Sequence, residues 1–182
     1  KIHFMGIGGS ANSAVALIAR EFGYDVSGCD IEEETAYLDK VKEKITEVYV
    51  GHDTSHINQA DLVVVSPALL YSNKNHPEVE KALSTNRLMT WEEFTGKYLL
   101  EDKEVIAISG THGKSTTTAL AGLVLEKAMK DPSVIIGAKV KDWNSNFIIG
   151  NSDIFIMGLI LINFLPMNCV GNLPDTLSTV TF

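Results

Sequence analysis

Cysteine, basic residues and long apolar runs are all scarce in this sequence of 182 residues. Its two cysteines, Cys29 and Cys169, are too few for a disulfide framework, which is typical of the reducing cytoplasm, and we expect a cytoplasmic location. The 15 basic residues are outnumbered by 23 acidic ones, so the formal net charge of −8 argues against a nucleic-acid groove. The most apolar tract, residues 154–165, is interrupted by Asn163 and is shorter than the roughly 20 residues that span a bilayer. Neither nucleic acid nor membrane insertion is therefore expected.

Metal ligands at short, regular spacing are also missing. No histidine–cysteine cluster with the spacing of a zinc site can be found in the sequence. His52, His56 and His76 lie in polar stretches, and we interpret them as ordinary surface or loop histidines. The sequence alone therefore predicts no zinc site.

Short β-rich runs alternate with helical patterns along the chain. Such alternation predicts an α/β fold with parallel strands covered by helices on both faces. The charged residues 101–103 interrupt the pattern just before a second series of strands, so we expect domains at 1–102 and 103–182. The expected strands are 1–7, 24–30, 47–50, 61–66, 87–89, 104–109, 133–136, 146–149 and 153–157, and the expected helices are 10–22, 33–44, 77–84, 90–100 and 114–129.

A glycine-rich loop, "GIGGSA" at residues 6–11, lies between the first expected strand and helix. Gly6 permits a tight turn, Gly8 allows a diphosphate to approach the backbone, and Ala11 is small enough for the helix to pack on the sheet. Asp30 ends the next strand at about the spacing at which an acidic residue meets a ribose hydroxyl. The pattern predicts a Rossmann-like nucleotide-binding domain. A purely structural turn and a nicotinamide-dependent oxidoreductase are the alternatives for this loop alone.

A second loop, "GTHGKSTTT" at residues 110–118, follows the apolar run "EVIAIS" and precedes a helical pattern. Gly113, Lys114 and Ser115 fit the end of the phosphate-loop pattern, although Ile108 stands where the leading glycine is expected. Backbone N–H groups would surround a phosphate, the lysine would reach the β- and γ-oxygens, and the serine hydroxyl would ligate Mg²⁺. The bland alternative is that the hydroxyl residues only cap a helix. The loop predicts ATP and Mg²⁺ as cofactors in a P-loop α/β domain.

The two loops together resemble those of the Mur ligase family, nearest to the members that join L-alanine to UDP-N-acetylmuramate. The similarity includes "HFMGIGGSANSAVA", "GYDVSGCD", "GHDTSHI", "ADLVVVSPAL" and "GTHGKSTTT", and it extends from residue 1 to about 156. Ala11 and Asn12 stand where the family usually has glycine and methionine. The resemblance implies that the first loop binds a UDP-sugar rather than NAD, through Gly6, Gly8, Gly9, Asp30 and Ser66, with His52 as a weaker candidate. It implies that the second binds ATP, through Gly110, Thr111, His112, Gly113, Lys114, Ser115 and Thr116.

The activity implied by the resemblance is ATP-dependent amide-bond formation in peptidoglycan precursor synthesis. UDP-N-acetylmuramate and L-alanine would be the substrates, Lys114 the catalytic residue, and Ser115 the Mg²⁺ ligand. The related ligase that reattaches recycled peptide to UDP-N-acetylmuramate shares these motifs and remains an alternative, as does a non-catalytic nucleotide-binding module.

The resemblance ends where the family has an acidic metal-binding motif. After "GNSDIFI" at 150–156 the sequence continues as "MGLILINFLP", and no acidic residue occurs between Asp153 and Asp175. We therefore expect an incomplete P-loop domain that is inactive by itself, with apolar side chains such as Ile160 and Phe164 exposed in residues 157–182. A frame change, a truncation and a divergent paralogue are all compatible with this segment.

Overall fold

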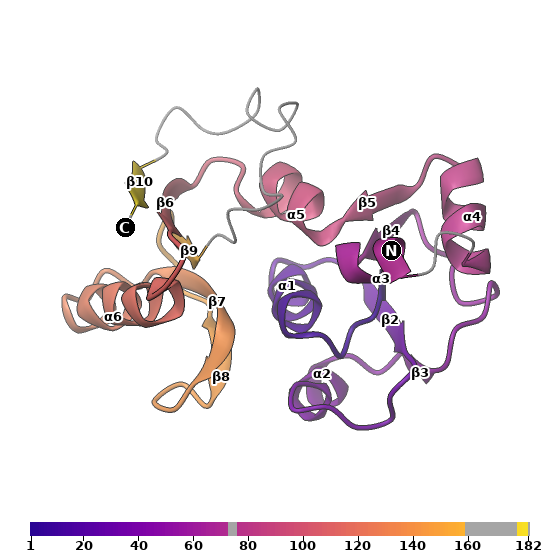
Figure 1. Cartoon of the computed structure of the whole chain (residues 1–182), viewed down its shortest axis with the longest axis horizontal. Helices are drawn as coiled ribbons and strands as arrows, with labels where there is room; N and C mark the ends of the chain where they lie inside the picture. The colour runs from indigo at the N-terminus through magenta and orange to yellow at the C-terminus, as the bar shows by residue number, and fades with distance from the viewer. Residues whose placement is uncertain (73–75, 159–177, 182) are drawn as a thin grey trace. The chain divides into compact units, whose positions relative to one another are not determined.

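The computed structural model describes residues 1–72, 76–158 and 178–181, and it divides the chain into two compact units, Lys1–Phe94 and Thr95–Phe182 (Figure 1). The sequence placed the boundary after residue 102, beyond the division seen here, and we keep the domain assignment as a proposal. We expected exposed apolar side chains in residues 157–182. Of these, residues 159–177 and 182 lie outside the described part of the chain.

The first unit contains a five-stranded sheet in the order β3-β2-β1-β4-β5. All four strand pairs are parallel, as the strand–helix alternation predicts. The strands are β1 (Ile2–Met5), β2 (Val26–Asp30), β3 (Val48–Val50), β4 (Leu62–Val65) and β5 (Leu88–Thr90). Strand order reverses at β1, because the chain proceeds from β1 to β2 and β3 on one side and then returns to β4 and β5 on the other.

Five helices belong to this unit: α1 (Ser10–Glu21), α2 (Leu38–Lys44), α3 (Pro67–Ser72), α4 (Pro77–Ser84) and α5 (Trp91–Phe94). Helix α4 has the predicted bounds, since His76 accepts a hydrogen bond from the Glu78 N–H and Pro77 occupies the first turn. Helix α2 begins later than predicted. The Thr35 hydroxyl accepts hydrogen bonds from the N–H groups of Tyr37 and Leu38, so the helix starts only after this turn.

The central strand β1 is buried along its whole length and packs on both faces. On one face Phe4 contacts Phe94 edge-on, with ring centroids 5.7 Å apart. On the other face Met5 belongs to a cluster that includes Cys29 of β2 and Val79 of α4. Figure 1 shows α1 and α2 on one side of the β2 ribbon and α4 on the other. The two faces alternate along β1, so His3 shares the α4 face with Met5.

The second unit contains a sheet in the order β10-β6-β9-β7-β8. Its elements are the π-helix η1 (Thr95–Leu99), β6 (Glu104–Ser109), α6 (Lys114–Lys127), β7 (Ser133–Val140), β8 (Ser145–Ile148), β9 (Ile154–Gly158) and β10 (Ser178–Thr181). The strands β6, β9, β7 and β10 pair in parallel, whereas β7 and β8 form an antiparallel hairpin. The few residues between β7 and β8 cannot form a parallel crossover, which explains this departure from the all-parallel expectation.

The core of the second unit lies between this sheet and α6. Ile108, Val134, Ile136 and Ile156 are buried there, and Leu125 and Trp143 pack against them. The predicted α/β class is thus confirmed in both units. Among the described residues, no helix is long and apolar enough to cross a membrane.

Candidate nucleotide sites

The first glycine loop lies at the carboxyl edge of the first sheet, where strand order reverses. Met5 pairs with Cys29 of β2 and with Val65 of β4. Gly6, Asp30 and Ser66 directly follow these three paired residues, so the sheet brings them to the same edge. Crevices at such a reversal are where open α/β sheets bind ligands.

The backbone of this loop is held by the protein itself. Gly6 has a φ of +73°, a conformation that glycine adopts without strain, and its N–H donates to the Cys29 carbonyl at 2.8 Å. The Asn12 side-chain amide donates to the Met5 carbonyl at 2.7 Å. Asn12 therefore fixes the start of α1 against the end of β1, a role that the sequence pattern did not reveal.

Gly8 makes the tightest approach in the loop. A Cβ atom at this position would lie 2.9 Å from Asp30 Oδ2, 3.0 Å from Thr35 Cγ2 and 3.1 Å from Leu38 Cγ. The Gly8 N–H donates to Asp30 Oδ2 at 2.7 Å, and the Thr35 hydroxyl donates to the Gly8 carbonyl at 2.9 Å. Asp30 is only 8% exposed and also accepts the Glu32 N–H at 3.2 Å. Its carboxylate thus holds the loop in shape, and only a part of its oxygen surface is left to meet a ligand.

The second loop lies at the carboxyl end of β6, and its residues are more open. Thr111, His112, Gly113, Ser115 and Thr116 are all exposed. Gly113 has a φ of +77°, and no atom lies within 4 Å of the position that a Cβ would occupy. Gly110 also has a positive φ, of +154°. At Gly113 a side chain would have room, so it is the positive φ that favours glycine at this position.

Lys114 begins helix α6 and folds back over this loop. Its Nζ donates to the Gly110 carbonyl at 2.5 Å and lies 3.3 Å from the Thr111 carbonyl. The ammonium group is therefore held above the loop, at the positive end of the α6 dipole. Thr118 donates to the Lys114 carbonyl at 2.8 Å and is buried, whereas Ser115 and Thr116 face solvent. Among the four hydroxyl residues 115–118, only Thr118 is buried.

Strand β9 ends beside this loop, because Gly158 pairs with Ile108 of β6. If the loop held a phosphate, a side chain at or just beyond this end could ligate the metal ion that accompanies the phosphate. The described residues of β9, Ile154–Gly158, carry no carboxylate. Asp153 precedes the strand at its opposite end and has an 84% exposed side chain.

The three histidines interpreted as ordinary surface or loop residues lie together, and that interpretation is wrong in this respect. The side chains of His52 and His56 are only 12% and 15% exposed, and both contact Glu78, which is 1% exposed. His76 is buried and packs edge-on against His52, with ring centroids 4.6 Å apart. No sequence spacing signals this group, because its members come from separate segments.

Comparison with known proteins identifies the class. The family described as Mur ligase family, catalytic domain, matches residues 1–89. The UDP-N-acetylmuramate--L-alanine ligase of Caldicellulosiruptor saccharolyticus is 40% identical over 159 residues, which cover 86% of this chain and 34% of that protein. The ligase of the same name from Clostridium acetobutylicum is 41% identical over 157 residues, covering 86% of this chain and 33% of the relative. The chain is thus similar to the Mur ligase family, and it spans about a third of the length of these curated relatives.

Solved structures agree with this placement. The UDP-N-acetylmuramate-alanine ligase MurC of Thermotoga maritima is 35% identical with a TM-score of 0.73, covering 87% of this chain and 37% of that one. A murein peptide ligase from Psychrobacter arcticus is 26% identical with a TM-score of 0.77, over 87% of this chain and 37% of that one. Both kinds of ligase that the sequence left open are therefore among the structural relatives.

Proposed function

We propose that this chain carries the UDP-sugar loop and the ATP loop of an ATP-dependent ligase that joins L-alanine to UDP-N-acetylmuramate. The observation that supports this most is the pairing of two glycine loops, each at the carboxyl edge of its own α/β sheet. A dinucleotide-dependent oxidoreductase would use the first loop and leave Lys114 and its exposed neighbours without a role.

In the first unit, Gly6, Gly8 and Gly9 would present backbone to the diphosphate of the UDP-sugar, near the start of α1. The unpaired N–H groups and the dipole of a helix N-terminus favour a phosphate group. Ser66 would approach the same ligand from the end of β4. Asp30 would act chiefly by holding Gly8, since its carboxylate accepts the Gly8 N–H at 2.7 Å.

In the second unit, residues 110–116 would surround the ATP phosphates. The left-handed conformation of Gly113 and the empty space beside it suit a loop that curls around an anion. Lys114 would exchange its two carbonyl partners for β- and γ-phosphate oxygens, and the exposed Ser115 hydroxyl would ligate Mg²⁺. ATP supplies the phosphoryl group that turns a carboxylate into a reactive acyl phosphate.

The reaction follows from the weakness of a carboxylate as an electrophile. A carboxylate oxygen of the sugar nucleotide forms a bond to the γ-phosphorus, and the bond between that phosphorus and the β-phosphate oxygen breaks to release ADP. The amine of L-alanine then attacks the acyl carbon, loses a proton and displaces phosphate, leaving the amide. The role of Lys114 is to position the phosphates and neutralise their charge.

The amino substrate is the finer part of the proposal. L-alanine is favoured because curated relatives at 40% and 41% identity bear the name of the alanine ligase. Ligation of a recycled peptide is the alternative, since a murein peptide ligase has a similar structure. A non-catalytic nucleotide-binding module is a second candidate, favoured by the carboxylate-free end of β9 beside the phosphate loop.

Calorimetric titration of the chain with UDP-N-acetylmuramate and, separately, with NAD⁺ tests the proposal. We expect the UDP-sugar to bind more tightly, and tighter binding of NAD⁺ would contradict the assignment of the first loop. An ADP-release assay with UDP-N-acetylmuramate, Mg²⁺ and either L-alanine or the peptide addresses activity. We expect this chain to show no substrate-dependent turnover, because no carboxylate occurs between Asp153 and Asp175.

A further inference from the structure

Four of the five histidines in the sequence gather around one buried carboxylate on the α4 face of the first sheet. His3 lies on β1 and is fully buried, His52 and His56 follow β3, and His76 caps α4. Glu78 on α4 lies among them, together with Cys29 at the end of β2. None of these residues belongs to either glycine loop, and among them only His52 is a candidate contact of the UDP-sugar. We call the group the histidine cluster (His3, Cys29, His52, His56, His76 and Glu78).

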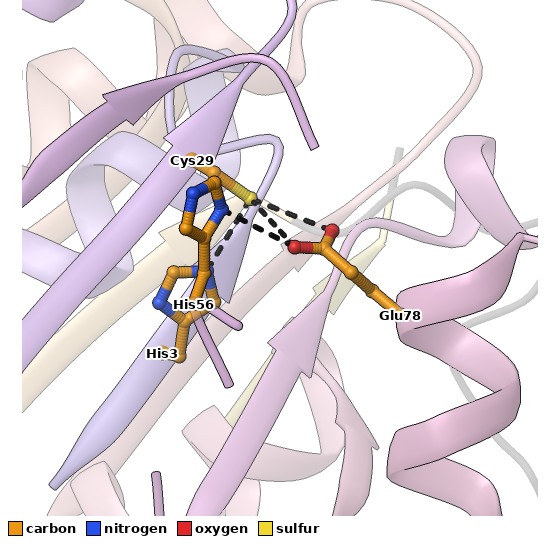
Figure 2. A group of neighbouring side chains, drawn as sticks. All are labelled: His3, Cys29, His56 and Glu78. Carbon is orange, nitrogen blue, oxygen red and sulfur yellow. Dashed lines mark hydrogen bonds and ion pairs between the residues drawn. The ribbon is translucent and has the colours of Figure 1, made fainter. Parts of the chain in front are cut away.

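Four side chains of the cluster converge as ligands would around an ion (Figure 2). The ligand atoms of His3, Cys29, His56 and Glu78 all lie within 4.8 Å of one another. His3 Nε2 is 3.3 Å from Cys29 Sγ, which is 3.7 Å from Glu78 Oε2. His56 Nδ1 is 3.4 Å from Glu78 Oε1. Tetrahedral zinc with bonds of about 2.0–2.3 Å separates its ligand atoms by roughly 3.3–3.7 Å, so these distances already match.

Neighbouring groups hold the ligands in position. His3 Nδ1 lies 3.0 Å from the Ser27 hydroxyl, so a proton on Nδ1 leaves the Nε2 lone pair facing Cys29. The ring of His56 stacks on Tyr49, with centroids 4.4 Å apart and an interplanar angle of 8°. Its Nδ1 is buried and has no hydrogen-bond partner among the described residues. The Asp53 N–H donates to Glu78 Oε1 at 3.0 Å, which fixes the carboxylate.

We propose that His3, Cys29, His56 and Glu78 form a structural zinc site. Two histidine nitrogens, one thiolate and one carboxylate are ligands that Zn²⁺ accepts, and four protein ligands leave no open position for catalysis. The hard cations Mg²⁺ and Ca²⁺ prefer oxygen ligands and do not suit this set.

Charge also favours a divalent ion at this position. The thiolate and the carboxylate together carry two negative charges, which a single Zn²⁺ neutralises in a buried environment. His3 is fully buried, where a charged imidazolium is disfavoured, and the neutral imidazole is the form that binds metal. The Cys29 side chain is fully buried, and zinc would displace the thiol proton as it binds, which gives the thiolate counted above. His52 Nδ1, 3.0 Å from Glu78 Oε2, would then hydrogen-bond the carboxylate oxygen.

Such an ion would connect four segments that are separate in the sequence. These are β1, β2, the segment after β3, and the first turn of α4. Binding to the folded state alone would stabilise the first unit, by an amount that rises with the logarithm of the zinc concentration above the Kd. The site would therefore act on the stability of the unit that carries the UDP-sugar loop, whatever the ligand of that loop proves to be.

The direct test uses the whole 182-residue chain without any substitution. After incubation with Zn²⁺ and gel filtration, elemental analysis should find one zinc per chain. Titration with Co²⁺ should produce a thiolate-to-cobalt charge-transfer band and the intense visible bands of tetrahedral cobalt, and Zn²⁺ should abolish both. A chain that emerges metal-free, or a cobalt spectrum without the thiolate band, would overturn the proposal.

Three substitutions locate the ion. Cys29→Ser should abolish the thiolate band and lower zinc affinity by more than about 100-fold, because loss of a ligand exceeds the effect of losing a neighbour of a ligand. Ser27→Ala, which removes only the partner of His3, should lower affinity about tenfold and leave the band in place. His112→Ala, which changes the exposed histidine outside the cluster, is the matched control and should change neither quantity. Zinc binding that Cys29→Ser leaves unchanged would assign the ion to another site and refute this one.

Discussion

The two glycine loops follow strands in the same way, yet different physical constraints require Gly8 of the first and Gly113 of the second. In the first loop, the space around Gly8 is occupied by Asp30, Thr35 and Leu38, and its φ is not positive. In the second loop, the space beside Gly113 is empty and its φ is +77°. One glycine is required because a side chain has no room, and the other because a side chain would strain the backbone.

The two loops should also differ in whether a substitution affects the stability of the unit or the binding of a ligand. The first loop is part of the core, since the buried Asp30 and Asn12 bond its backbone. The second is a surface loop in which Lys114 bonds only carbonyl groups that a ligand could replace. Changes in the first loop should therefore act mainly on the free energy of unfolding, and loss of the Lys114 ammonium in the second mainly on ligand affinity.

The largest effect is expected for Gly8→Val. Three atoms lie within about 3 Å of the position of the new Cβ, so the unfolding free energy of the first unit should fall by about 3 kcal/mol. Each unit contains one of the two tryptophans, Trp91 or Trp143. Urea denaturation of the Trp143→Phe background, followed by Trp91 fluorescence, measures the first unit alone. Gly9→Ala is the control, because its Cβ would lie at an ordinary 3.4 Å from its nearest neighbour.

Asp30→Asn tests the bond that holds the first loop. The amide can still accept the Gly8 N–H but loses the negative charge, so we expect a loss of about 2 kcal/mol of unfolding free energy. Asp25→Asn, which alters a 68% exposed side chain, should change stability by less than about 0.5 kcal/mol. Equal effects from both substitutions would show that Asp30 does not hold the loop.

Substitutions at Gly113 should follow backbone strain instead of size. Gly113→Val should lower the stability of the second unit by about 1–2 kcal/mol, because β-branched residues avoid positive φ. Gly113→Asn should lower it by less, since asparagine tolerates this conformation. Trp143 fluorescence in the Trp91→Phe background reports the transition. A larger loss for Asn than for Val would contradict the assignment of strain as the cause.

The smallest effect on stability is expected at Glu92, a carboxyl group that the first unit buries without a full set of hydrogen-bond partners. Burial raises the pKa of Glu92 above its usual range, and its Oε2 has no hydrogen-bond partner among the described residues. A carboxyl with a raised pKa in the folded state favours folding at low pH and loses that contribution as pH rises through the folded pKa. Glu92→Gln should therefore stabilise the first unit at pH 7 by less than about 1 kcal/mol and have no effect in acid. Denaturation at both pH values checks this, and a stabilisation that persists in acid would exclude ionisation as the cause.

Local patterns predicted much of this fold, because strands and helices depend largely on neighbouring residues. The buried run at 104–109 and helix α4 have the predicted bounds. Helix α3 (Pro67–Ser72) is too short to show helical periodicity, and β10 (Ser178–Thr181) is a short strand that was not predicted. The helix expected at 90–100 is divided into α5 and the π-helix η1.

Local patterns are limited in the same way when they are used to predict the candidate sites. Both loops could be found from the sequence because each is one continuous motif. Asn12 and Thr35 act on the first loop through backbone contacts that no motif encodes. The histidine cluster depends on the sheet order β3-β2-β1-β4, which brings residues 3, 29, 56 and 78 together. Strand order cannot be derived from local spacing, so sequence patterns do not reveal the cluster.

Binding of MgATP and UDP-N-acetylmuramate to the Lys114→Ala chain, measured by calorimetry beside the parent chain, tests the central claim most directly. The account predicts that loss of the ammonium weakens MgATP binding by about 3 kcal/mol, roughly 100-fold, because a charge-assisted contact to phosphate is lost. It also predicts unchanged affinity for UDP-N-acetylmuramate and an unchanged free energy of unfolding. Unaltered MgATP affinity in the variant, or equal loss of both ligands, would contradict the assignment of two separate nucleotide loops.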